Sequence, residues 1–177
     1  MKKSICIILA SIMIVCLMLT GCAQTPASSS GSAAPAADTT DTAAYVFTYN
    51  SVAIPMDAPA APIVAQLGEP LSYFESESCA FEGIDKTYTY QSFVLNTYPK
   101  DGVDYVSSVR LTNDTVSTAE GIYIGSTLDS VNAAYSGSFT VGETGCSFKA
   151  GNMTLSFILD AATGNVTSIK YSSNIAQ

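Results

Sequence analysis

The sequence predicts an α+β fold in which two tandem helix-plus-antiparallel-meander repeats form one curved antiparallel sheet with short helices on one face. Three observations predict it. Similar segments recur along the chain, as they do in proteins with internal repeats. Each repeat begins with a short amphipathic segment that is typical of a helix. Runs of alternating apolar and polar residues follow, separated by turn-forming residues, which is typical of strands. Repeat one is expected at about residues 45–115 and repeat two at about residues 116–177.

Two pairs of segments show the repeat most clearly. Residues 63–68 (IVAQLG) correspond to residues 131–136 (VNAAYS). Residues 106–111 (VSSVRL) correspond to residues 166–171 (VTSIKY). The spacing between the copies shrinks toward the end of the chain, which indicates a shorter loop in the second repeat.

Both helices are expected to be short. Residues 126–129 (STLD) are similar to a capping box and predict the start of the second helix. Pro59 and Pro62 shorten the first helix, and Gly68 ends it. Strands are expected at 78–81, 86–95 and 105–111 in repeat one, at 144–149, 153–159 and 165–171 in repeat two, and at 45–49 and 51–54 in a leading hairpin.

The chain begins with the features of an exported precursor. Two lysines precede an apolar run, residues 5–19, which is shorter than the roughly 20 residues of a membrane span. The following residues, LTGC, resemble a bacterial lipobox, so residues 1–21 are expected to be a signal peptide. The resemblance implies that Cys22 carries diacylglycerol and fatty acids such as palmitate. An uncleaved anchor helix is the alternative.

The lipobox predicts a lipid-anchored protein on the extracytoplasmic face of the cell membrane. Ala23 stands where an inner-membrane retention signal would have aspartate, so a cell with two membranes would place the protein in the outer membrane. Residues 22–44 contain no large apolar side chain after the cysteine and are expected to form a disordered Ala/Ser/Thr/Pro tether. A globular domain is expected over residues 45–177. The formal net charge of −8 argues against nucleic acid as a partner.

Two segments resemble a known superfamily. Residues 122–135, with the pattern I-x-I-G-S-x-x-D-S-V-x-x-A-Y, and residues 64–70 (VAQLGEP) resemble the helix signature of the SmpA/OmlA and beta-lactamase-inhibitor-protein-like superfamily. Residues 73–111 resemble a group of uncharacterised lipoproteins of Gram-positive bacteria. The resemblance implies the tandem repeat fold above. It implies no inhibitory activity, because no contact residue of the inhibitor is matched.

The domain is expected to contain no catalytic thiol. Cys79 and Cys146 occupy corresponding positions in the two repeats, and the chain has no histidine to lower a thiol pKa. The acids near Cys79 would raise its pKa. Two interpretations of the pair remain open: both are small apolar core residues, or they form a disulfide, which an exported location permits.

No metal or cofactor site is expected. Four acids, Glu75, Glu77, Glu82 and Asp85, lack the spacing of a calcium loop and are interpreted as solvated turn residues. Period-two alternation places Tyr88 and Tyr90 on one face of a strand. That face is either core or a binding surface, since tyrosine is common at interfaces.

Together these observations predict a non-catalytic, membrane-anchored module that binds another envelope protein or a wall component. The alternative is a ligand-binding or sensory lipoprotein for a small molecule or a sugar. An enzyme would need a convergent pair of carboxylates in a cleft, and the sequence indicates none. The partner and the oligomeric state do not follow from the sequence.

Overall fold

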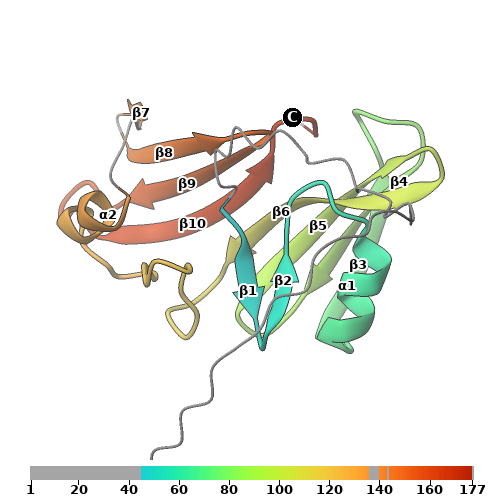
Figure 1. The fold of residues 1–177 in the computed structure, drawn as a ribbon, viewed down its shortest axis with the longest axis horizontal. Helices are drawn as coiled ribbons and strands as arrows, with labels where there is room; N and C mark the ends of the chain where they lie inside the picture. Colours follow the sequence, from blue (N-terminus) through green and yellow to red (C-terminus); the bar gives the residue numbers. More distant parts are fainter. Residues whose placement is uncertain (1–44, 136–139, 143, 177) are drawn as a thin grey trace, which may run out of the picture. The chain divides into compact units, whose positions relative to one another are not determined.

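A single antiparallel sheet dominates the computed structural model, which describes residues 45–135, 140–142 and 144–176 (Figure 1). Its strand order is β3-β4-β5-β6-β10-β9-β8-β7, and β1 and β2 form a separate hairpin. The predicted signal peptide, Cys22 and the predicted tether lie outside the described residues. The elements are β1 (Phe47–Tyr49), β2 (Val52–Ile54), α1 (Ala60–Leu67), β3 (Ser72–Glu77), β4 (Ile84–Thr89), β5 (Phe93–Lys100), β6 (Val103–Leu111), α2 (Leu128–Ala134), β7 (Thr140–Gly142), β8 (Gly145–Ala150), β9 (Met153–Leu159) and β10 (Val166–Ser173).

The predicted α+β class with tandem helix-plus-meander repeats is wrong, because the domain is mainly β. Its described residues contain two helices, of eight and seven residues. The eight strands form one continuous sheet, in which the pairing of β6 with β10 joins strands that are distant in the sequence. No described helix is long and apolar enough to cross a bilayer.

The first strand of the sheet was missed by the sequence prediction. β3 is exposed along its whole length, so it has no buried face and no apolar alternation. The segment predicted as a strand, residues 78–81, instead forms the loop between β3 and β4. There the Ser78 hydroxyl accepts a hydrogen bond from the Phe81 amide, and the Ser78 amide donates to the Gly83 carbonyl.

The two helices follow from local chemistry. α2 begins after Thr127, whose hydroxyl accepts a hydrogen bond from the Ser130 amide at 3.2 Å. The N-cap is therefore one residue beyond the predicted Ser126. Pro62 lies in the first turn of α1, where the missing amide removes no helical hydrogen bond. α1 ends at Gly68, whose φ of 79° favours glycine.

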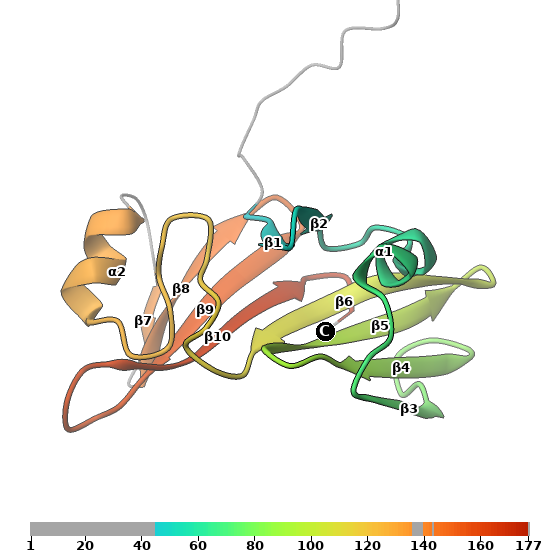
Figure 2. The same ribbon diagram turned by 90° about the horizontal axis from the view of Figure 1, so that it is seen from below.

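The core lies on one face of the sheet. A row of facing residues crosses it from strand to strand, and all of them are buried: Leu95, Val109, Tyr171, Leu155 and Phe148. α1, α2 and the β1–β2 hairpin lie on this side of the sheet (Figure 2). They contribute Ile63, Val131 and Phe47 to the core. The opposite face of the sheet carries the alternate residues of each strand.

Phe47 closes the core over the join between β6 and β10. Its ring is fully buried and lies 5.2 Å from the ring of Phe93 on β5 and 5.8 Å from that of Tyr171 on β10. The β1–β2 turn holds it there, because Asn50 and Ser51 both adopt positive φ, as in a two-residue hairpin turn. The hairpin thus packs on strands from both sides of the join.

Replacing Phe47 by alanine is expected to lower the free energy of unfolding by about 3–5 kcal/mol, because a buried phenylalanine leaves a cavity. The matched control is Phe74→Ala, at a side chain that is 65 % exposed, which should change it by less than about 0.5 kcal/mol. Urea unfolding followed by circular dichroism measures both. Equal losses for the two variants would contradict this account of the core.

Candidate functional site

The two tyrosines predicted as core or binding surface have different environments. Tyr90 is 6 % exposed; its ring stacks on Phe93, and its hydroxyl donates to the Gly68 carbonyl at 3.4 Å. It is a core residue. Tyr88 is only partly buried, and its ring lies 5.0 Å from that of Tyr73 on β3. Tyr88 therefore marks the boundary between the core and the edge of the sheet.

That edge is formed by β3, which has only β4 as a neighbour among the described strands. Its outer side leaves backbone donors and acceptors free for another strand. Three large side chains here are unusually exposed: Leu71 by 74 %, Phe74 by 65 % and Tyr73 by 48 %. We call Leu71 and β3 together the aromatic edge. A free strand edge with exposed apolar groups is a typical place for a partner to bind.

The aromatic edge is held firmly to the rest of the sheet. Its register with β4 pairs Tyr73 with Tyr88 and Glu75 with Lys86. The amide of Leu71 donates to the carbonyl of Thr89 at 2.7 Å and extends the pairing by one residue. The strand is therefore exposed but already in the extended conformation that a partner strand requires.

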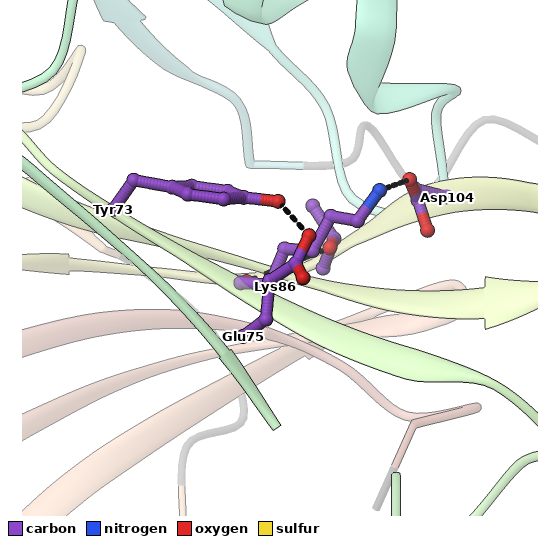
Figure 3. A network of polar contacts seen from close by, with 5 residues as sticks. Tyr73, Glu75, Lys86 and Asp104 are labelled. Atoms are coloured by element: carbon purple, nitrogen blue, oxygen red, sulfur yellow. Dashed lines mark hydrogen bonds and ion pairs between the residues drawn. The ribbon is translucent and has the colours of Figure 1, made fainter. Parts of the chain in front are cut away.

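A polar network flanks the two tyrosines (Figure 3). The Tyr73 hydroxyl donates to the carboxylate of Glu75. Lys86 Nζ lies 2.7 Å from Asp104 Oδ2, so this ion pair connects β4 to β6 across β5. Both side chains are about a quarter exposed, and such a pair contributes at most about 1 kcal/mol. Its role is to orient the side chains next to the edge.

The network holds its protons at neutral pH. The hydrogen bond to Glu75 is the main cause that raises the pKa of Tyr73, and partial burial raises it further. The hydrogen bond to Asp104 raises the pKa of Lys86, although burial opposes it. A neutral tyrosine and a charged lysine with higher pKa values are poor proton donors near pH 7. Tyr73 therefore stays neutral and Lys86 stays charged near pH 7, and both can make hydrogen bonds next to the edge.

A shallow hollow lies beside the aromatic edge, between the end of α1 and the two tyrosines. It opens to solvent and is mostly apolar on its α1 side. Its shape could receive one apolar side chain of a segment laid along β3. It is lined by Val64, Ala65, Gly68, Glu69, Pro70, Tyr73 and Tyr88.

The two cysteines of the domain are free and lie in different surroundings. Cys79 is exposed in the loop between β3 and β4, and Cys146 is buried in β8. They do not occupy the corresponding strand positions that the repeat predicted, and no disulfide joins them in this structure. Burial raises the pKa of Cys146, which disfavours the reactive thiolate.

The remaining predicted features form no further site. Of the four acids interpreted as turn residues, Glu75 and Glu77 lie on β3 and Asp85 lies on β4, so only Glu82 lies in a loop. Within the described part of the chain, no group of three or more histidine, cysteine or acidic residues is placed to hold a metal ion. Leu71 and Phe74 were not predicted as site residues. The sequence feature that could have indicated this exposed segment is the pair of adjacent aromatic residues, Tyr73 and Phe74, which follows Pro70.

Comparison with known proteins relates the domain to solved structures. No family model and no curated protein matches the sequence. A cysteine-rich secretory protein from Staphylococcus aureus aligns with a TM-score of 0.48 and 13 % identity, covering 67 % of this chain and 44 % of that chain. An extracellular protein containing an SCP domain from Bacillus anthracis aligns with a TM-score of 0.51 and 12 % identity, covering 82 % of this chain and 50 % of that chain.

These matches concern the fold alone, and this chain spans half or less of the length of each matched protein. The resemblance to the SmpA/OmlA and beta-lactamase-inhibitor-protein-like superfamily is wrong, because the matched structure from Bacillus anthracis is an extracellular protein containing an SCP domain. The quoted helix signatures describe short turn-and-helix segments. Such segments recur in different folds and identify none of them.

The environments of the cysteines predict their reactivity. A maleimide added to the folded protein should label Cys79 rapidly, while Cys146 should be labelled only after unfolding, because it is buried and its thiolate is disfavoured. Peptide mapping by mass spectrometry after different labelling times measures both rates. Protection of Cys79 in the folded, unreduced protein and its release by a reductant would contradict the free thiol.

Proposed function

We propose that the protein is a lipid-anchored, non-catalytic module outside the cytoplasm, and that it binds a polypeptide along the aromatic edge. The observation that carries the proposal is the full exposure of an edge strand that presents Leu71, Tyr73 and Phe74. An extended segment paired with β3 would use the free backbone groups for affinity. The exposed side chains would supply specificity.

The charge of the edge favours a particular kind of segment. Glu75 and Glu77 lie on β3, and Glu69 lines the hollow beside it. Acids on an edge strand oppose pairing with a second copy of the same strand. They attract a segment with basic residues. We therefore expect an extended, basic segment with at least one apolar residue for the hollow.

The expected location supports this function. The lipobox at Cys22 would anchor the protein by its lipid, and the residues up to about 44 would act as a spacer. The Bacillus anthracis structure that shares the fold is described as an extracellular protein, which agrees with an exported domain. An anchored module of this kind would hold its partner at the membrane surface.

Small-molecule binding is the second candidate, and the hollow beside Tyr73 and Tyr88 favours it. The hollow is open to solvent, however, whereas small-molecule sites bury most of their ligand. The continuous sheet also leaves no cleft between β6 and β10, where the strands pair directly. Saturable binding of a sugar or metabolite that is lost in Tyr88→Ser would favour this candidate.

The polypeptide site is tested by photocrosslinking in cells. A photoreactive residue at position 74 should give a specific protein adduct, because Phe74 lies on the free edge. The matched control is position 123, where Tyr123 is also an exposed aromatic residue but lies outside the sheet. Mass spectrometry identifies the adduct. No adduct at position 74, or the same adducts at both positions, would argue against the edge as the site.

The lipid anchor is tested separately. Cys22→Ser should abolish the incorporation of labelled palmitate, because the thiol that carries the thioether-linked lipid is lost. Cys79→Ser should retain the label. Incorporation of the label by the Cys22→Ser variant would contradict lipid attachment at Cys22, and a wild-type protein without label would support the uncleaved anchor helix.

A further inference from the structure

The open face of the sheet, opposite the core, has the reverse charge of the domain as a whole. Three of its exposed residues are basic: Arg110 on β6, Lys170 on β10 and Lys149 on β8. The chain carries a formal net charge of −8, and only five of its basic residues follow position 44. Most of the cations of the domain are therefore collected on one surface.

Two of these cations face each other directly. Lys170 and Arg110 are a cross-strand pair in the register of β10 with β6, and both side chains lie on the open face. Like charges directly opposite each other on neighbouring strands destabilise a sheet. The repulsion between Lys170 and Arg110 lowers the stability of the sheet. Replacing either residue by serine or threonine would remove this repulsion.

No acid compensates the pair within the described residues. β8, β9 and β10 contain no acidic residue, and the one acid of β6, Asp104, lies on the core side and binds Lys86. The described ion pairs include none to Arg110, Lys149 or Lys170. The cations are thus free to bind an anion from outside the domain.

Hydroxyl groups continue the row that the two cations begin. Across the sheet, Lys170 faces Ser156 on β9, and Ser156 faces Ser147 on β8. Lys149 lies two residues beyond Ser147 on the same face. Because neighbouring strands are roughly 4.8 Å apart, these residues form a line of hydrogen-bond donors. We call Arg110, Lys149, Lys170, Ser147 and Ser156 the basic face.

We propose that the basic face binds a linear, phosphate-bearing polyanion that lies across strands β6, β10, β9 and β8. Arginine and lysine neutralise phosphate oxygens, and serine hydroxyls donate to them. Repeated anionic groups along a flexible chain match repeated donors along a row. This second site is independent of the aromatic edge, which lies at the far side of the sheet beyond β4 and β5.

Two other occupants fit the face less well. An acidic protein would need an apolar anchor at the centre of its interface, and the row from Arg110 to Ser147 contains no large apolar residue. A membrane of anionic lipids would meet the acidic remainder of the domain as well as the basic face. A thin chain lying on the row meets mainly the cations, since acids beyond about 8–10 Å are screened at physiological salt.

The probe for this site is short inorganic polyphosphate, titrated into the purified full-length lipoprotein in a neutral detergent. Wild-type protein should bind it saturably, with an affinity that falls as salt rises. Arg110→Ser combined with Lys170→Ser should lower the affinity at least tenfold and make the salt dependence shallower. The control Lys100→Ser removes one exposed lysine at the end of β5, and it should change the affinity less than twofold.

Folding is checked in the same variants. The double variant should unfold at the same temperature as wild-type protein or at a higher one, because a repulsive pair is removed.

Lack of binding by the wild type, or equal losses in the double variant and in Lys100→Ser, would overturn the proposal. Tighter binding to poly-glutamate would identify an acidic protein as the occupant instead, and binding only to vesicles containing an anionic phospholipid would identify a membrane. Crosslinking at position 74 does not depend on any of these results.

Discussion

The pairing of β10 with β6 is the constraint on which the rest of the structure depends. The segment that contains α2 and β7 to β9 separates the two strands in the sequence. Their pairing therefore joins distant parts of the chain and sets the order of the sheet. It brings Val109 beside Tyr171 on the buried face and Arg110 beside Lys170 on the open face. Because side chains alternate along a strand, a shift of one residue would exchange these faces. Phe47 packs across the join and favours the observed register.

The same alternation gives the domain two surfaces with opposite chemistry. At one end of the sheet, β3 has no second neighbour among the described strands, and its exposed side chains are aromatic or acidic apart from two serines. Over the four neighbouring strands β6, β10, β9 and β8, the open face carries cations and hydroxyl groups and no acid. A uniform acidic surface would keep the protein soluble and repel most anionic partners. Separating the charges would allow one small domain to attract the proposed basic segment at its edge and the proposed anionic chain on its face.

Much of the strand content could be predicted from the sequence, but its arrangement could not. The expected strand at 153–159 coincides with β9, and the leading hairpin and β6 were also expected, because apolar alternation and turn residues are local signals. The matching segments suggested two tandem meanders in one curved sheet, but no local pattern records which strands join them, because the pairing of β6 with β10 is a contact between distant segments. β3 was missed for a related reason. A strand with no buried face has no alternation to detect, so Ser72–Glu77 looked like a loop with acids and aromatics.

The candidate site was only partly predictable for the same physical reason. Period two correctly placed Tyr88 and Tyr90 on one face, but burial on that face depends on which neighbours cover each side chain along the strand. Tyr90 lies where Gly68 and Phe93 cover it, whereas Tyr88 has only the exposed Tyr73 beside it. The basic face was equally hidden, because Arg110 and Lys170 are sixty residues apart and become neighbours only through the register of β6 with β10. Both proposed binding surfaces are therefore properties of the topology of the domain, and a sequence motif for either one is not expected to exist.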